Sequence, residues 1–311
     1  MSFHHIPVLL EEALGALNIK PEGVYLDGTA GGGGHSLEIA RRLAGGRLVS
    51  IDKDPQAVEA ASRRLRDYPQ AEVVQGDFAD LGDILDALGI GRVDGILLDL
   101  GVSSHQVDTA ERGFSYHLDA PLDMRMTGSG RTAADLLAGA GVAELTDIFR
   151  RYGEEKFALR IAKKIESIRA EEPILTTAQL SEIVRASIPA PARREGGHPA
   201  KRVFQALRIA VNGELDSLAA ALEAAFERLN RGGRLAIITF HSLEDRMVKQ
   251  AFAGFCKGCV CPPDFPVCVC GKTPRGRLVG RKPQAASPAE LAQNPRSKSA
   301  KLRTIEKLRD D

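Results

Sequence analysis

The chain has 311 residues, of which 43% are hydrophobic and 27% charged, with a formal net charge of +1. This composition is typical of a globular protein and excludes collagen-like, mucin-like and wholly disordered chains. No segment approaches the roughly 18 continuous apolar residues of a membrane helix, and the N-terminal residues lack the basic region and cleavage site of a secretory signal. We therefore expect a cytoplasmic protein of about two domains.

The charge is unevenly distributed along the chain. From Lys272 to the C-terminus there are eleven Lys and Arg residues and four Asp and Glu residues, which leaves a net charge of −6 on the remainder. A basic tail on an acidic body favours a polyanionic partner. A solvated, partly disordered terminus explains the same charge pattern.

The first hundred residues alternate short apolar runs with segments of helical periodicity. Four strands are predicted, at Val24–Leu26, Leu48–Ile51, Ala71–Val74 and Gly95–Leu98. A helix is predicted over His35–Leu43, and Pro55 opens another. Each strand ends at or near an aspartate, in order Asp27, Asp52, Asp77 and Asp99. This alternation is typical of a parallel sheet with helices on both faces, in which ligands bind at the carboxyl ends of the strands.

From about residue 132 to residue 230 the periodicity is helical. Apolar residues three and four apart predict helices at Ala143–Arg151, Phe157–Ile168 and Leu180–Ala186. A strand returns at Leu235–Phe240, and a helix follows at Leu243–Phe255. Because a late strand most simply rejoins the first sheet, we predict a discontinuous domain, residues 1–107 plus 209–311. A helical domain over residues 108–208 interrupts it.

A glycine-rich loop, residues 27–35, joins the first strand to the first helix. It lacks the Gly-Lys-Ser/Thr of a P-loop, and only Gly31 and Gly33 match a dinucleotide fingerprint. The spacing of Asp27, Gly31 and Gly33 matches class I S-adenosylmethionine-dependent methyltransferases. In that pattern Asp52 contacts ribose, Asp77 and Phe78 contact adenine, and Asp99 lies beside the methyl donor. A dinucleotide oxidoreductase remains the alternative, since each aspartate alone is also explained as a helix cap.

Longer motifs are spread along the whole chain. They are His4–Glu12, Asp99–Gln106, Glu111–Ser115, Pro121–Met126, Tyr152–Phe157, His198–Arg208, Phe240–Arg246 and Asn294–Arg303. With these motifs the sequence resembles the ribosomal RNA small-subunit methyltransferase H family, also called MraW. That family uses S-adenosylmethionine to methylate N4 of a cytidine in the decoding centre of 16S ribosomal RNA, cytidine 1402.

The resemblance carries expectations about fold, partner and cofactor site. It implies a class I methyltransferase fold, a Rossmann-like doubly wound sheet with an inserted helical domain. The implied partner is 16S rRNA of the small ribosomal subunit, with neither a membrane nor DNA expected; the oligomeric state stays open, a homodimer included. The implied cofactor contacts are Gly33, Gly34, His35, Asp52, Phe78, Asp99 and Gln106. Asp27, Gly31 and Asp77 are further candidates.

The exocyclic amine of cytosine is a poor nucleophile, and hydrogen-bond acceptors help to orient it. Many amino methyltransferases have Asn/Asp-Pro-Pro-Tyr/Phe after the fourth strand; this chain has Asp99-Leu-Gly-Val. Asp99 therefore orients either the cofactor or the target amine. Ser103 either accepts a hydrogen bond or caps the next segment. His241 either acts in the reaction or packs. A competing hypothesis is a ribosome assembly factor that keeps this fold but has no activity. The intact series of four aspartates argues against it.

A basic cluster in the helical region is predicted to contact RNA phosphates. Its members are Arg193, Arg194, Lys201, Arg202 and Arg208. An ordinary solvated helix face is the alternative. A cytosine extruded from RNA needs a stacking surface, for which the candidates are Phe114, Tyr116 and Phe240, each also explained by core packing.

The five cysteines lie in one short segment. They are Cys256, Cys259, Cys261, Cys268 and Cys270. Four close thiols suffice for a tetrahedral zinc site, but the spacing is not that of a standard zinc finger. A reduced loop without metal is the alternative, and no metal is expected to take part in methyl transfer.

Overall fold

The computed structural model describes residues 7–193, 197–259, 261–262, 266–267 and 269–310. The chain divides into two compact units. Unit 1 comprises Met1–Gly101 and Asp216–Asp311, and unit 2 comprises Val102–Leu215. These bounds lie within about seven residues of the predicted domain limits.

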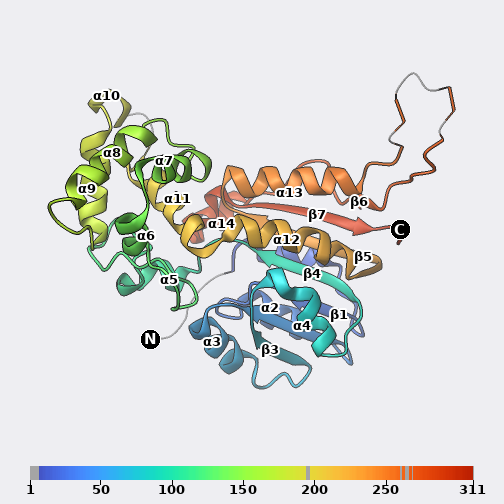
Figure 1. The fold of residues 1–311 in the computed structure, drawn as a ribbon. Coiled ribbons are helices and arrows are strands. Elements are labelled where there is room, and N and C mark those ends of the chain that lie inside the picture. The colour runs from blue at the N-terminus through green and yellow to red at the C-terminus, as the bar shows by residue number, and fades with distance from the viewer. Residues whose placement is uncertain (1–6, 194–196, 260, 263–265, 268, 311) are drawn as a thin grey trace. The chain divides into compact units, whose positions relative to one another are not determined.

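Unit 1 is built on a seven-stranded sheet with the order β3-β2-β1-β4-β5-β7-β6 (Figure 1). The strands are β1 (Val24–Asp27), β2 (Arg47–Asp52), β3 (Ala71–Gln75), β4 (Val93–Asp99), β5 (Leu229–Thr239), β6 (Gly276–Leu278) and β7 (Lys301–Lys307). Strands β1 to β5 pair in parallel, while β7 is antiparallel to both of its neighbours. The order reverses between β1 and β4, which is the switch point at which doubly wound sheets bind ligands. The predicted Rossmann-like doubly wound sheet is confirmed.

Helices cover both faces of this sheet. In unit 1 they are α1 (Leu10–Leu17), α2 (Gly34–Ala40), α3 (Pro55–Leu65), α4 (Leu81–Ala87), α13 (Ser242–Phe255) and α14 (Pro288–Gln293), with the 3-10 turns η1 (Phe78–Asp80) and η3 (Pro295–Ser299). Along β4, Ile96 and Leu98 pack with α4, α12 (Glu214–Glu227) and α13 in one core cluster, whereas Leu97 packs with α1 and α2 in another. Because both faces of β4 are buried, its central residues Ile96 to Leu98 form an uninterrupted apolar run.

Unit 2 is helical, as the periodicity predicted. Its helices are α5 (Ser104–Asp108), α6 (Ala133–Gly139), α7 (Val142–Arg151), α8 (Ala158–Arg169), α9 (Thr177–Ser187), α10 (Ala190–Arg193) and α11 (Lys201–Asn212), with η2 (Ala110–Arg112); α12 (Glu214–Glu227) begins at its boundary. Phe149, Ile161, Leu180 and Leu207 are fully buried and belong to one hydrophobic core. The unit therefore has a core of its own.

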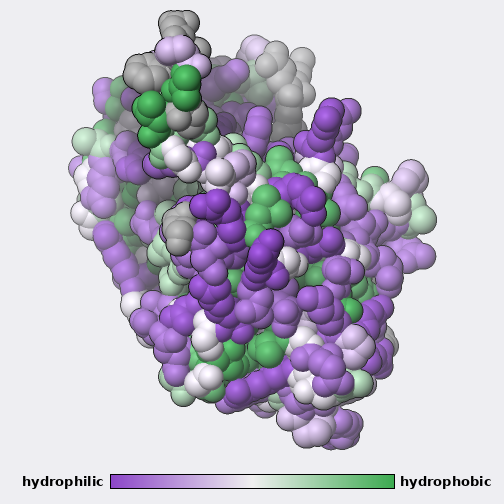
Figure 2. Space-filling view, turned by 90° about the vertical axis from the view of Figure 1, so that its right-hand side faces the viewer, coloured by the Kyte–Doolittle hydropathy of each residue, from purple (hydrophilic) through white to green (hydrophobic). Residues whose placement is uncertain are grey.

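The surface offers no membrane-spanning element in the described part of the chain. None of its helices is both long enough and apolar enough to cross a bilayer. The face seen in Figure 2 is mostly hydrophilic, and its hydrophobic side chains form small separate patches.

Candidate functional site

The four predicted aspartates lie at the carboxyl edge of the sheet in unit 1. Asp27, Asp52 and Asp99 are the last residues of β1, β2 and β4, and Asp77 follows β3. Because these four strands are consecutive neighbours in the sheet, their carboxyl groups form a row across the switch point. The row is the candidate site.

The glycine loop beside this row is closely packed against its neighbours. Gly33 has a φ of +74°, and a Cβ built there would lie 3.1 Å from the Cα of Ala61. A Cβ on Gly34 would lie 2.5 Å from Cγ of Pro7. A side chain at either position would have to displace these atoms, so the tight packing of the loop requires glycine.

Asp27 is fully buried and its oxygens are occupied by the protein. Ser36 Oγ donates to Oδ2 at 2.6 Å, and the backbone N–H of Thr29 donates to Oδ1 at 3.2 Å. Ser50 Oγ extends the network by donating to Ser36 Oγ at 2.9 Å. Burial raises the pKa of Asp27, and the hydrogen bonds oppose this shift. Asp27 thus anchors the two ends of the loop to each other.

Asp52 connects the loop to β2. Its Oδ2 accepts the N–H of Gly31 at 2.7 Å, and its Oδ1 accepts the N–H of Asp54 at 2.9 Å. Burial raises the pKa of Asp52 to about 6, although both hydrogen bonds favour the ionised form. Each oxygen still has a second lone pair for a ligand hydroxyl.

Asp77 and Phe78 follow β3. Asp77 Oδ1 caps η1 through the N–H of Ala79 at 2.9 Å, while Oδ2 accepts from Ser217 Oγ at 3.0 Å and lies 3.6 Å from Lys53 Nζ. Phe78 is half-buried at the edge of the core that contains α4 and α12. It therefore leaves part of its ring open to a planar ligand.

His35 lies beside Asp99, with its Nδ1 3.7 Å from Asp99 Oδ2. The other ring nitrogen, Nε2, lies 3.0 Å from the carbonyl oxygen of Val8. A carbonyl only accepts, so Nε2 carries the hydrogen and Nδ1 of the neutral ring keeps its lone pair. Burial lowers the pKa of His35 to about 4, so the ring is neutral at neutral pH.

The Asp99 carboxyl has an unused acceptor. Its Oδ1 is buried and has no hydrogen-bond partner among the described residues, whereas the side chain as a whole is 20% exposed. Burial, then the charges of Asp27 and Glu244, raise the pKa of Asp99 well above its usual value. Buried polar atoms in proteins almost always have partners, so this oxygen marks a position for a ligand group.

Ser103 and Gln106 belong to unit 2, where they form a capping box at the start of α5. Ser103 Oγ accepts the N–H of Gln106 at 3.2 Å, and Gln106 Oε1 accepts the N–H of Ser103 at 2.9 Å. Ser103 therefore caps the next segment, one of its two predicted roles. The predicted cofactor contact of Gln106 rests on the family resemblance alone.

His241 has a similar capping role in unit 1. It is the N-cap of α13, where its Nδ1 accepts the N–H of Glu244 at 3.3 Å. Glu244 in turn accepts the backbone N–H groups of Phe240 and His241. The reciprocal cap is buried and favours packing over a part in the reaction.

An aromatic cluster in unit 2 gathers residues from distant segments. Tyr116 stacks on His198 with ring centroids 4.5 Å apart, and Phe204 meets Tyr116 edge-on at 5.7 Å. Phe114 is buried in the core of unit 2, which favours packing. Phe240 lies in unit 1, where a Cβ on Gly101 would be 3.4 Å from its ring.

The predicted basic cluster divides into exposed and paired members. Lys201 and Arg202 are exposed at the start of α11, although Arg202 also donates to the carbonyl of Glu154 at 2.9 Å, and Arg193 is half-buried at the end of α10. Arg208 differs, because its guanidinium binds both carboxylate oxygens of Glu214 at 2.8 and 2.7 Å, with both side chains largely buried. Arg194 lies outside the described residues.

Several basic residues of the tail are paired within unit 1. Arg303 donates to Asp245 at 2.7 Å, and Lys301 donates to the same carboxylate at 3.3 Å. Lys307 is 1% exposed and donates to the carbonyl of Glu227 at 2.8 Å. The net charge of the tail therefore does not by itself indicate a polyanion site.

Several residues that organise the site escaped sequence reasoning. Thr29 accepts the backbone N–H of Asp99 at 2.6 Å through Oγ1, while Ser36 and Ser50 support Asp27. His198 was noticed only within a motif. Ser36 lies two residues after the last glycine of the loop, which is the one signal that pointed to it; the others depend on contacts between distant segments.

Comparison with known proteins gives concordant results. Residues 2–308 match the MraW methylase family. A protein of Heliobacterium modesticaldum named ribosomal RNA small subunit methyltransferase H is 56% identical over 313 residues, covering 99% of this chain and 100% of that protein. A protein of Symbiobacterium thermophilum with the same name is 56% identical over 311 residues, covering 99% and 98%.

Proposed function

The chain belongs to the MraW methylase family, and from this membership we propose that it methylates N4 of a cytidine in small-subunit ribosomal RNA with S-adenosylmethionine as donor. The target is the decoding-centre cytidine 1402 of 16S rRNA. This substrate implies that the protein acts in the cytoplasm. The observation that carries the assignment within the structure is the row of strand-end carboxylates with the unpartnered Oδ1 of Asp99.

The residues of unit 1 fit this cofactor. The Asp52 carboxylate has lone pairs for vicinal ribose hydroxyls, and the partly open ring of Phe78 suits a purine. Asp77 stands beside Phe78, where it is suited to the adenine amino group. Gly33, Gly34 and His35 form the adjoining backbone, held by Asp27. When bound, S-adenosylmethionine supplies an electrophilic methyl group on a sulfonium.

Asp99 is proposed to act on the target amine rather than on the cofactor. Its free Oδ1 is a hydrogen-bond acceptor suited to an exocyclic amino group. Because its pKa is raised, the ionised Asp99 is a stronger base than an ordinary aspartate and can take the proton that N4 loses when it gains a methyl group. Neutral His35 places its Nδ1 lone pair 3.7 Å from the other oxygen, Oδ2, so the ring adds no positive charge that would reduce the basicity of Asp99.

Unit 2 is proposed to recognise RNA. Arg193, Lys201 and Arg202 leave cationic groups at or near the surface, and phosphate contacts dominate RNA affinity. Tyr116 and His198 form a stacked pair, and aromatic faces stack well on unpaired bases. The phosphate contacts would position the strand, and the rings would hold a base next to the target.

The assay that tests this function uses S-adenosylmethionine with a labelled methyl group. The acceptors are small ribosomal subunits and naked 16S rRNA, both from cells lacking the enzyme. We expect label in N4-methylcytidine from one decoding-centre fragment, resolved by nucleoside mass spectrometry. Intact cofactor binding without label in either acceptor would refute the substrate assignment. Failure to bind the cofactor would instead favour a non-catalytic assembly factor.

A further inference from the structure

The segment between α13 and β6 leaves the fold and returns to it at a fixed point. The N–H of Arg275 donates to the carbonyl of Phe255 at 2.9 Å, which joins the two ends of the segment. Gly258 packs against the ring of Pro274 near this junction. Figure 1 shows the segment extending from the end of α13. All five cysteines of the chain lie between these ends.

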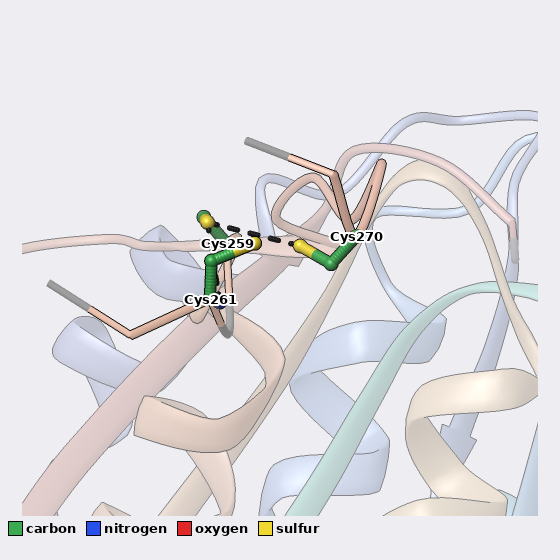
Figure 3. Close-up of side chains that lie close together, drawn as sticks. All are labelled: Cys259, Cys261 and Cys270. Carbon is green, nitrogen blue, oxygen red and sulfur yellow. Dashed lines mark hydrogen bonds between the residues drawn. The ribbon is translucent and has the colours of Figure 1, made fainter. Parts of the chain in front are cut away.

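Three of these thiols converge. The Sγ atoms of Cys259, Cys261 and Cys270 all lie within 4.8 Å of one another, and those of Cys259 and Cys270 are 3.7 Å apart. Figure 3 shows that the three side chains point toward one another. Zinc–sulfur bonds of about 2.3 Å at tetrahedral angles put neighbouring sulfurs about 3.8 Å apart. The 3.7 Å between the sulfurs of Cys259 and Cys270 matches this sulfur–sulfur distance.

Backbone N–H groups point at the sulfurs. The N–H of Cys261 lies 3.4 Å from Cys259 Sγ, and the N–H of Val269 lies 3.4 Å from Cys261 Sγ. The thiolate is the form of cysteine that binds metals, and backbone N–H groups that point at a metal-bound sulfur can donate hydrogen bonds to it. The loop backbone is thus arranged around sulfur ligands.

Hydrophobic burial does not explain why this loop folds back on itself. The side chains of Val267 and Val269, beside Cys270, are 69% and 72% exposed. Small segments without an apolar core commonly depend on a metal or a disulfide for their structure. A metal held by the three thiols supplies that constraint.

We propose that this loop binds one Zn²⁺ ion through the thiolates of Cys259, Cys261 and Cys270. The described residues thereby provide three of the four ligands of a tetrahedral site, and the three thiols release three protons on binding. No electron transfer is involved. The site follows the C-terminus of α13. The N-terminus of α13 follows β5, whose carboxyl end lies at the same edge of the sheet as the strand-end row, and a helix of 14 residues is about 21 Å long. The ion is therefore structural.

The first test measures zinc in the full-length protein purified under reducing conditions from zinc-supplemented cells. We expect about one Zn²⁺ per chain by elemental mass spectrometry, and an intense visible absorption from sulfur-to-metal charge transfer after exchange with Co²⁺. Less than about a tenth of an equivalent of zinc, or a Co²⁺ complex without sulfur bands, would overturn the proposal.

The second test compares cysteine variants. Cys259→Ser, Cys261→Ser and Cys270→Ser should each weaken Zn²⁺ affinity at least tenfold. Cys256→Ser, whose thiol is outside the cluster, should bind zinc like the wild type. Titration with S-adenosylmethionine shows that each variant is folded, because the strand-end row contains no cysteine. Equal zinc affinity in all four variants, or a Cys259–Cys270 disulfide in the reduced preparation, would contradict the site.

Discussion

The proposed ribose contact of Asp52 makes cofactor affinity depend on pH. In the free protein burial raises the pKa of Asp52 to about 6, so lowering the pH protonates it and removes the form that accepts hydroxyl hydrogen bonds. At about pH 5 roughly a tenth of the free protein is ionised, which weakens binding about tenfold, or ~1.4 kcal/mol, relative to a pH well above 6. Affinity should level off above about pH 7.

Titration calorimetry with S-adenosylmethionine between about pH 8 and pH 5 measures this profile. Asp52→Ala should weaken binding at neutral pH by about 1–3 kcal/mol and lose the dependence in the acid range. Asp67→Ala is the matched control, because this side chain is 79% exposed and lies outside the row; it should keep the wild-type profile. A wild-type profile that is flat, or one that survives in Asp52→Ala, would refute the assignment.

Three further predictions concern other members of the site. Asp99→Asn should lower the methylation rate constant, measured by single-turnover kinetics, about 10²-fold or more. Its affinity for the cofactor, measured by calorimetry, should change less than about threefold. A matching loss of cofactor affinity would instead place Asp99 against the cofactor. In filter-binding assays, Arg202→Glu should weaken RNA binding and reduce the slope of log affinity against log salt concentration by about one. Arg185 is another exposed arginine of unit 2, and Arg185→Glu should have little effect. Equal effects of the two substitutions would indicate a non-specific effect of charge. Arg208→Ala should lower the free energy of unfolding by about 1.5–3 kcal/mol in chemical denaturation, because Glu214 loses both hydrogen bonds; an unchanged stability would argue against a structural role.

The last strand shows where sequence reasoning stopped short. Leu302 and Ile305 of β7 are buried and enter the two cores on opposite faces of the sheet. Both apolar residues are visible in the sequence, but the three basic residues of the strand, Lys301, Arg303 and Lys307, suggested a solvated tail or a polyanion site. Their partners Asp245 and Glu227 are 58 and 80 residues away along the chain. The net charge of a segment does not show whether its basic residues pair with acidic residues that are so distant along the chain.

Local signals were more informative than charge. The βα period predicted the four strands and the row of aspartates, because strand ends and helix starts are determined by neighbouring residues. Residue roles were harder to predict: Ser103 and His241 each have a Gln or Glu three positions later, and in the folded chain both form capping boxes. The capping pattern and a catalytic pattern use the same residue types, so only the hydrogen bonds separate them.

The aspartates of the row differ in how far the protein satisfies them, and this difference separates their proposed roles. Asp27 is fully buried with both oxygens bonded to the loop, so it can hold the loop but not a ligand. Each carboxylate oxygen of Asp52 accepts one hydrogen bond from a backbone N–H and keeps a lone pair for a neutral hydroxyl. Of the four, only Asp99 has a buried oxygen without a partner among the described residues, together with a pKa raised by burial and then by the charges of Asp27 and Glu244. Such a carboxyl is stabilised most by a group that first donates a hydrogen bond to it and then transfers a proton. The amine of a cytosine does both when it is methylated.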